Sequence, residues 1–416
     1  MSATVAERLA AGVAPLVGGE LPVRLRAWDG SETGPVDAPR VVINSPDALK
    51  RLVWRPGELG AAQAYVSGEI DVDHDLDTAL THVWAVARER GLSGVKASPA
   101  AVAALLRVVR DFKPGLPPSP PASQAKLRGR LHSRLRDRSA ISHHYDLSND
   151  FYALILDESM AYSSGYWTSD DPSYTLADAQ RDKLDLVLHK LGLEPGMTLL
   201  DVGCGWGSLS LHAAAKGITV TGVTIAAEQK KFVDARVAER GLAGNVEIRL
   251  QDYRDVTGTY DAVASIEMGE HVGQGDYPTY AAVLRRSVRP GGRVLVQQMS
   301  RRGRHPGGGP FIESFIAPDM HMRPVGETVA LLEDGGLEVR DVHALREHYV
   351  KTVAAWYATF ESNYERVVAL VGEEVARVWR LYLVGGGMAF RDGRMGVDQI
   401  VAVRPGNPFT IPEVRS

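Results

Sequence analysis

The stretch 197–207 constrains the fold of this chain more than any other part of its sequence. Its first six residues are mostly aliphatic or β-branched, which is typical of a strand covered on both faces. Gly203, Gly205 and Gly207 follow at a spacing of two, and glycine permits positive φ and close approach of a ligand. A helix opening at Trp206 would present free N–H groups at its start. A purely structural turn is the alternative, but the flanking strand and helix favour a binding loop.

The spacing of these glycines differs from the dinucleotide motif Gly-x-Gly-x-x-Gly. The pattern Asp201-x-Gly203-x-Gly205-x-Gly207 resembles the nucleotide-binding loop of class I S-adenosylmethionine methyltransferases. That cofactor has no pyrophosphate, so it needs no phosphate cradle. Its methionine end needs backbone donors and acceptors, which a turn of this kind supplies.

The chain around this turn alternates between helical and strand patterns. We expect helices at 175–191, 206–215, 226–240 and 276–288, and strands at 197–202, 217–223, 245–250, 260–266 and 292–299. Such alternation predicts an α/β fold with a doubly wound, mostly parallel sheet. Further helices are expected at 327–335, 349–370 and 372–384 and a last strand at 399–403, with an inserted lid or substrate loop at 300–326. Ligands of such sheets bind at the carboxyl ends of the strands.

The length of 416 residues indicates two or three domains. Residues 1–112 show no catalytic constellation, and we interpret them as a smaller N-terminal α+β accessory domain with strands at 22–28 and 40–43. Five prolines and a basic run mark 113–140 as a linker. We expect residues 141–416 to form the methyltransferase domain that the resemblance of the glycine turn implies.

Composition excludes several classes of protein. Cys204 is the single cysteine, so an intrachain disulfide and a multi-cysteine metal site are excluded, and we expect no metal. No apolar run approaches the length of a transmembrane helix, and the N-terminus lacks a signal-peptide pattern. We therefore expect a cytoplasmic protein.

Basic residues are concentrated between positions 121 and 140. This stretch contains six lysines and arginines and a single acidic residue, Asp137. A solvated linker is one interpretation, and a patch for anionic phospholipid headgroups is the other. No aromatic residues interleave with these charges, so we expect no nucleic acid partner. The membrane interpretation predicts a peripherally membrane-associated protein.

Aromatic residues gather in the segment 160–167. Tyr162, Tyr166 and Trp167 lie within six residues of one another. Electron-rich rings attract cations, and S-adenosylmethionine is a sulfonium cation. We therefore expect this cluster to contribute to a cofactor site.

Five motifs, in order, resemble those of the cyclopropane-fatty-acyl-phospholipid synthases and the related mycolic acid methyltransferases. The resemblance covers about residues 140–405. Its motifs are 144–152 (HYDLSNDFY), Tyr162-Ser163, 201–207 (DVGCGWG), 270–273 (EHVG), and Tyr349-x-Lys351-Thr352-x-x-x-Trp356. The resemblance implies a class I methyltransferase that uses S-adenosylmethionine.

The resemblance also implies a reaction. The alkene of an unsaturated acyl chain attacks the sulfonium methyl group, and a base then removes a proton from the resulting carbocation. Loss from the new methyl group closes a cyclopropane, whereas loss from a neighbouring position leaves a methylene or methyl-branched chain. In this family a bound bicarbonate commonly serves as the base.

Carried over to this sequence, the resemblance implies catalytic positions at Ser164, Glu270, His271, Gln297, Met299 and Tyr349. All of these except His271, which belongs to the 270–273 motif, are bicarbonate positions. Family members mostly have Cys, His and Ile where Ser164, Gln297 and Met299 stand. Glu267 adds an acid where the family often has Gly, and a buried carboxylate with a raised pKa could itself be the base. A surface or salt-bridged glutamate is the alternative for Glu267.

The cofactor positions match the family more fully. The resemblance implies that S-adenosylmethionine is bound by Tyr145, Tyr162, Ser163, Gly203, Gly205, Gly207, Thr224, Gln229, Asp252 and Tyr253. Because no acid follows the second strand, Gln229 is the expected partner of the ribose. Asp252 and Tyr253 are expected near the adenine.

These observations predict methyl transfer to the cis double bond of an unsaturated, oleoyl phospholipid, favouring a methylene branch because the base site is altered. A cyclopropane product is the first alternative, and a non-catalytic binding protein with a methyltransferase-like fold is the second. A methylene product would require a separate reductase partner to saturate it. We also expect a homo-oligomer.

Overall fold

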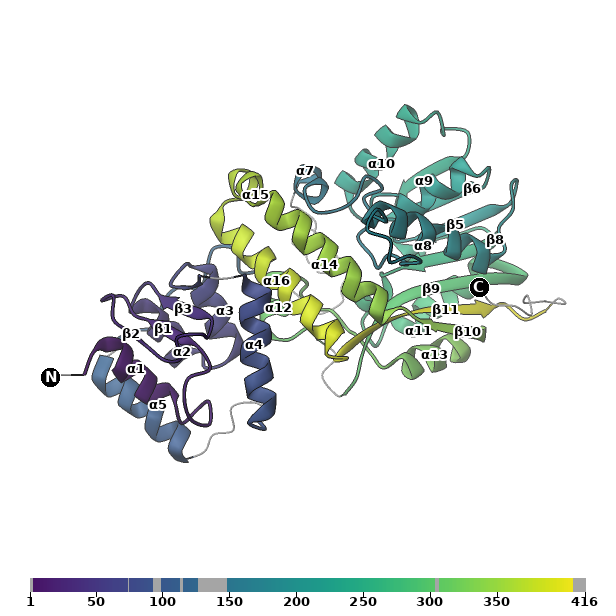
Figure 1. The fold of residues 1–416 in the computed structure, drawn as a ribbon. Helices are drawn as coiled ribbons and strands as arrows, with labels where there is room; N and C mark the ends of the chain where they lie inside the picture. Colours follow the sequence, from purple (N-terminus) through teal and green to yellow (C-terminus); the bar gives the residue numbers. More distant parts are fainter. Residues whose placement is uncertain are drawn as a thin grey trace. The chain divides into compact units, whose positions relative to one another are not determined.

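The computed structural model describes residues 3–73, 75–92, 99–112, 115–125, 148–303 and 307–406. They divide into two compact units, both drawn in Figure 1. The N-terminal unit comprises Met1–Gln124 and Val368–Gly385, and the C-terminal unit comprises Ala125–Val367 and Gly386–Ser416.

The C-terminal unit is built on a seven-stranded sheet in the order β10-β11-β9-β8-β5-β6-β7. The five strands from β9 to β7 are parallel, and β11 lies antiparallel between β9 and β10. The predicted doubly wound, mostly parallel α/β sheet is therefore confirmed. Its strands are β5 (Thr198–Val202), β6 (Thr219–Thr224), β7 (Val246–Leu250), β8 (Tyr260–Ile266), β9 (Val288–Arg301), β10 (Glu338–Ala344) and β11 (Met395–Val403).

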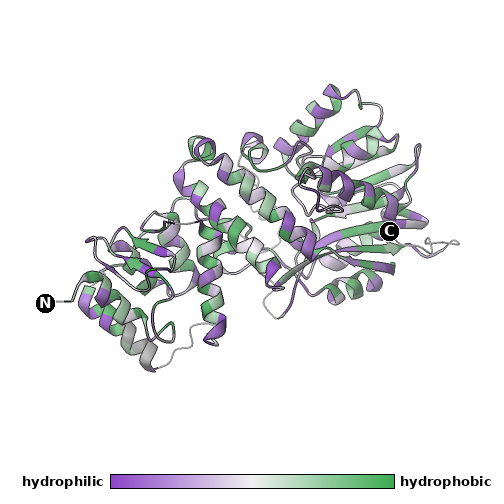
Figure 2. Cartoon of the chain, in the orientation of Figure 1, coloured by the Kyte–Doolittle hydropathy of each residue, from purple (hydrophilic) through white to green (hydrophobic). Residues whose placement is uncertain are grey.

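Helices cover both faces of this sheet. Aliphatic side chains of α8, α9 and α10 form one buried cluster with the sheet, and those of α11 and α13 form another. Figure 2 shows hydrophobic residues along the strands and mixed hydropathy on the helices, as this layering requires. The helices are α7 (Asn149–Ala153), α8 (Leu176–Leu191), α9 (Ser208–Ala215), α10 (Ala227–Glu239), α11 (Tyr277–Ser287), α12 (Pro310–Phe315), α13 (Val325–Asp334), α14 (Arg346–Ser362), α15 (Tyr364–Val371) and α16 (Glu373–Arg391), with 3₁₀ turns η1 (Tyr253–Asp255) and η2 (Gly269–His271).

Three local features of this unit differ from the prediction. The helix expected at 349–370 is divided into α14 and α15, with a break at Asn363. The helix after the glycine turn begins at Ser208 rather than Trp206, because Gly205 and Gly207 still have positive φ. Strand β10 was not predicted, because its burial alternates between exposed and partly buried and its residues are mostly polar or charged. An edge strand needs little apolar sequence to pair with a neighbour.

The N-terminal unit contains a four-stranded sheet in the order β2-β1-β3-β4. β1 and β3 are parallel, and the other two pairs are antiparallel. The short strands β2 and β4 and the helix α5 were not predicted from sequence. The elements are α1 (Val5–Val13), β1 (Arg24–Arg26), β2 (Glu32–Thr33), β3 (Arg40–Ile43), α2 (Asp47–Trp54), α3 (Glu58–Val66), β4 (Ile70–Val72), α4 (Leu76–Glu89) and α5 (Pro99–Phe112).

Residues 368–385, which the sequence reading placed in the methyltransferase domain, group with the N-terminal unit. The physical reason is visible at Arg377, whose side chain is buried against that unit. Its guanidinium donates hydrogen bonds to the carbonyls of Tyr65 and Ile70 and forms an ion pair with Asp71. Among the described residues, no helix combines the length and the apolar character needed to cross a bilayer.

Candidate active site

The glycine turn after β5 has the geometry expected of a binding loop. Gly203, Gly205 and Gly207 have φ values of 79°, 53° and 78°, a region that other residues avoid. A Cβ atom on Gly203 would lie 2.7 Å from the Met268 side chain, whereas one on Gly205 would meet nothing within 4 Å. Gly205 therefore faces open space, in the cavity described next.

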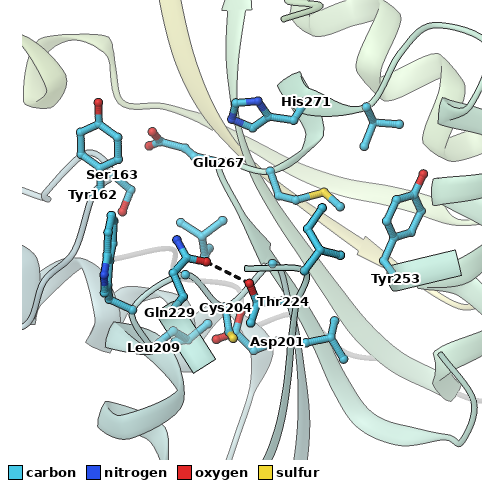
Figure 3. Close-up of a pocket in the computed structure, with 18 of the residues that line it drawn as sticks. Tyr162, Ser163, Asp201, Cys204, Leu209, Thr224, Gln229, Tyr253, Glu267 and His271 are labelled. Atoms are coloured by element: carbon cyan, nitrogen blue, oxygen red, sulfur yellow. Dashed lines mark hydrogen bonds between the residues drawn. The ribbon is translucent and has the colours of Figure 1, made fainter. Parts of the chain in front are cut away.

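This cavity opens at the carboxyl ends of β5, β6 and β8 and is shown in Figure 3. Most of the predicted cofactor residues lie together in its wall, although they come from widely separated parts of the chain. They are Tyr162, Ser163, Gly203, Gly205, Thr224, Gln229, Asp252 and Tyr253. Gly207 lies behind the wall, packed against Val233, and Tyr145 lies outside the described residues.

Two polar pairs orient the side chains on which a nucleoside would rest. Thr224 Oγ1 donates to Gln229 Oε1 at 2.9 Å, so the Gln229 amide N–H₂ is the group left to donate to a hydroxyl. Asp252 is held by the guanidinium of Arg254, with Nη2 at 2.7 Å from Oδ2. The Asp252 carboxylate therefore lines the site as the partner of an arginine. The ring of its neighbour Tyr253 packs edge-on against Tyr280.

The residues present fit S-adenosylmethionine. The turn offers backbone groups beside open space at Gly205, Gln229 offers an amide donor, and the wall is apolar at Ile266 and Met268. The aromatic cluster predicted from sequence divides, however. Only Tyr162 lines the cavity, close to Trp356 with ring centroids 5.3 Å apart.

Tyr166 and Trp167 are directed elsewhere, which corrects the prediction that they join the cofactor site. The Tyr166 ring packs on His348, with centroids 4.7 Å apart. Trp167 Nε1 donates to Thr352 Oγ1 at 3.1 Å, and the same oxygen accepts from the N–H of Gly165. These contacts hold residues 165–167 against α14, directly after Tyr162 and Ser163, which line the cavity.

The carboxylate of Glu267 is the centre of the polar end of the cavity. Its Oε1 accepts from the backbone N–H of Ser164 at 2.9 Å and from Gln297 Nε2 at 2.8 Å. Its Oε2 accepts from the Tyr349 hydroxyl at 2.7 Å. Glu267 therefore brings together three of the positions that the resemblance assigns to bicarbonate.

The backbone of Glu267 is unusual as well. Its φ of 49° lies in the left-handed region, which costs a non-glycine residue about 1–2 kcal/mol. Burial raises the pKa of its carboxyl group, against the opposing effect of the Ser164, Tyr349 and Gln297 hydrogen bonds. A strained, buried carboxylate at a cavity wall is a candidate for function.

Two further predicted catalytic residues, Glu270 and His271, lie on the 3₁₀ turn η2 that follows Glu267. Glu270 is fully buried, and burial followed by the nearby Glu267 charge raises its pKa well above the ordinary value. Its carboxyl oxygens have no hydrogen-bond partner among the described residues. His271 lines the cavity, and burial lowers its pKa to about 4, so its ring is neutral near pH 7.

Sequence reasoning missed Lys183, a fully buried lysine on α8 that lines the cavity. Its Nζ donates to Ser163 Oγ at 2.9 Å. Burial lowers its pKa to about 8, opposed by the negative charges of Glu267, Asp157 and Asp201. A lysine in a helical pattern normally reads as a surface residue, so no local signal marks this one.

The comparisons with known proteins agree with this geometry. Residues 132–400 match the family model described as mycolic acid cyclopropane synthetase. The chain belongs to this family. Tuberculostearic acid methyltransferase of Mycobacterium tuberculosis is 36% identical over 422 residues, covering 98% of this chain and 92% of that protein. Cyclopropane-fatty-acyl-phospholipid synthase of Escherichia coli is 32% identical over 363 residues, 87% of each chain.

A solved structure, mycolic acid cyclopropane synthase complexed with S-adenosylhomocysteine and CTAB, superposes with a TM-score of 0.60. It is 33% identical and covers 64% of this chain and 98% of its own. The chain is thus an S-adenosylmethionine-dependent methyltransferase of the cyclopropane synthetase family by sequence and by fold.

The cofactor site can be tested at Gly205. We expect Gly205→Val to weaken S-adenosylmethionine binding by about 100-fold or more, because the branched side chain would occupy the open space in the cavity. The measurement is calorimetric titration of the folded variant. Gly196→Val is the matched control: Gly196 also has positive φ and open space at its Cβ, but it does not line the cavity. Equal affinity of the two variants would refute this placement.

Proposed function

We propose that this protein methylates the cis double bond of an unsaturated, oleoyl phospholipid and that Glu267 is its base, giving a methylene branch. The observation that carries the proposal is the set of three hydrogen bonds to the Glu267 carboxylate. They come from Ser164, Gln297 and Tyr349, where the family resemblance implies a bicarbonate. A carboxylate of the chain itself then takes the place of the bound anion.

The substrate class is inferred from the relatives. The two relatives above carry the names tuberculostearic acid methyltransferase and cyclopropane-fatty-acyl-phospholipid synthase. Their common feature is an acyl chain. An apolar chain also suits the aromatic side chains beside the polar end of the cavity, since Tyr349 packs on Phe390 and lies near Trp356.

The chemistry divides between the cofactor and the protein. When bound, S-adenosylmethionine would supply an electrophilic methyl group: the π electrons of the alkene would bond to it as its bond to sulfur breaks, which would leave S-adenosylhomocysteine and a carbocation on the acyl chain. Glu267 then accepts a proton from that chain. Because two donors already occupy Oε1, the proton goes to Oε2, next to the Tyr349 hydroxyl. The hydroxyl can rotate and accept from the new acid.

The identity of the product follows from timing. Early loss of a proton from the new methyl group closes the cyclopropane, as its C–H electrons bond to the cationic carbon. If a hydride first moves from the methyl-bearing carbon to the cationic carbon, the positive charge moves to the methyl-bearing carbon, and loss of a methyl proton then gives a methylene branch (C=CH₂) on the open chain. A base displaced by about 1 Å changes which event is faster. Glu267 directly follows β8, so its carboxylate is covalently attached to the sheet. This attachment favours a base position displaced from that of a free anion.

The product identifies the function directly. Expression in a host that makes oleate is expected to yield a lipid acyl chain one CH₂ heavier, with an olefinic methylene signal by NMR. Upfield cyclopropane protons would instead support ring formation, and absence of both products together with no release of S-adenosylhomocysteine would support a non-catalytic binding protein. A methylene product would pass to a separate reductase that adds hydrogen across the new double bond.

We further propose that the basic stretch 121–138 docks the protein peripherally on anionic membranes; residues 126–138 lie outside the described part of the chain. Each basic residue near such a surface contributes about 1 kcal/mol, screened by salt. Replacing Arg128, Arg130 and Arg134 by Gln is expected to weaken vesicle binding at low salt. The measurement is co-sedimentation with anionic and neutral vesicles. Equal binding of the unaltered protein to both would contradict the proposed docking on anionic membranes.

A further inference from the structure

A series of three side-chain hydrogen bonds connects Lys190, through Gln399 and Gln297, to the Glu267 carboxylate. Gln297 on β9 and Gln399 on β11 stand opposite each other in antiparallel register, and both side chains are fully buried. Gln399 Nε2 donates to Gln297 Oε1 at 3.0 Å, and Gln297 Nε2 donates to Glu267 Oε1 at 2.8 Å. At the far end, Lys190 Nζ, from the last turn of α8, donates to Gln399 Oε1 at 2.8 Å.

The lysine gives this chain its direction. An ammonium group has three donors and no acceptor, so the Gln399 side-chain oxygen must face Lys190. The Gln399 N–H₂ group then faces Gln297, whose oxygen must face it in turn. Consequently the Gln297 N–H₂ group points at the Glu267 carboxylate. With both amides reversed, an amide oxygen would face the carboxylate, and the two would repel each other.

We propose that Lys190 and Gln399 are positioning residues that hold the Gln297 amide N–H₂ group toward Glu267 and so fix the orientation and basicity of the carboxylate. The inference rests on the proposed role of Glu267 as the base. Amides are poor proton carriers, so the chain transmits polarity rather than protons. Its effect is to keep Oε1 occupied by donors and leave Oε2 to receive the proton.

Other titratable groups interact with Glu267 and Lys190, the two ends of this hydrogen-bond series. Lys183 on α8, Tyr349 on α14 and Glu270 on η2 interact with Glu267. The negative charge of Asp341 on β10 acts on Lys190, whose pKa burial lowers to about 8.

His343, also on β10, has its Nδ1 2.9 Å from Lys190 Nζ. Burial lowers the pKa of His343, so its ring is neutral at pH 7 and Nδ1 accepts from the lysine. Lys190 is therefore held by two acceptors, one of them at the start of the amide chain.

The sharpest test reverses the chain with Gln399→Glu. A carboxylate at position 399 pairs with Lys190 and accepts from the Gln297 N–H₂ group, which turns the Gln297 oxygen toward Glu267. That repulsion raises the pKa of Glu267. We expect the acid limb of the kcat–pH profile to move up by about one pH unit, so that kcat measured on that limb, below the pKa of the base, falls about tenfold. Lys190→Met should move the limb in the same direction, and Lys190→Arg, which keeps a donor, should restore it.

The assay measures the S-adenosylhomocysteine that the enzyme releases when it acts on vesicles of dioleoyl phosphatidylglycerol at saturating S-adenosylmethionine. Ser300→Ala is the matched control, because Ser300 bonds Asp398 across the same two strands, apart from the amide chain. The inference would be overturned if Gln399→Glu lowered kcat without moving the acid limb, or if its pH profile were unchanged. If Glu267→Gln were inactive in the same assay, the proposed role of Glu267 as the base would still stand. Full activity of Glu267→Gln would instead overturn the proposed function, and the inference with it.

Discussion

Glu267→Gln is expected to lower turnover by about a thousandfold, within the range that a general base contributes, and to leave cofactor affinity unchanged. The substitution is close to isosteric. The new amide oxygen can accept from Ser164 and Gln297, and its N–H₂ group can donate to the Tyr349 oxygen, so the hydrogen bonds of the site survive. Only the capacity to accept a proton is lost. Single-turnover measurement of S-adenosylhomocysteine release, alongside calorimetric titration, separates the two effects.

The pH dependence of the unaltered enzyme gives an independent reading of the same group. A base acts only when deprotonated, so the rate falls as pH drops through the pKa of Glu267. Burial raises that pKa, so the fall begins above the pH expected for an ordinary glutamate. Glu239→Gln, an exposed position at the end of α10, is the control for loss of a glutamate elsewhere. A fully active Glu267→Gln would remove Glu267 from the mechanism and return the base to a bound anion.

Features written in local sequence were predictable. The strand β5 and the turn after it follow from adjacent residues, since a buried strand needs aliphatic side chains and the turn needs glycines at positive φ. The wall residues Thr224 and Asp252 follow from the rule that parallel strands place ligands at their carboxyl ends. Each of these inferences needs only a few neighbouring residues.

Features that depend on distant pairing were not predictable. Gln297 and Gln399 meet only because β11 enters the sheet antiparallel beside β9, and nothing local to either residue indicates it. Lys183 is buried because α8 turns that side chain toward the cavity, while Asp201 and Glu267 supply negative charge. The positive φ of Glu267 is likewise a tertiary property, although the glycine common at this position in the family is its sequence counterpart.

That glycine leads to the second large effect. Glu267→Gly removes the base but relieves the left-handed strain, since glycine adopts a φ of 49° freely. The variant is therefore expected to fold. It leaves three donors, from Ser164, Gln297 and Tyr349, directed at a space the size of a carboxylate. An unpaired buried donor costs about 1–3 kcal/mol, so these groups favour any small planar anion that reaches them.

We expect Glu267→Gly to be nearly inactive in bicarbonate-free buffer and to regain activity as bicarbonate is added, with saturation. Glu267→Gln is the matched control, because its amide still fills the space and no anion can enter. The rescued variant is also expected to shift its product from the methylene branch toward the cyclopropane, since a free anion close to the new methyl group can remove its proton before the hydride moves. Mass spectrometry and NMR of the lipids read both results. Rescue of Glu267→Gln as well would mean that bicarbonate acts outside this site, and a rescued variant that still made only methylene lipid would separate product choice from base position.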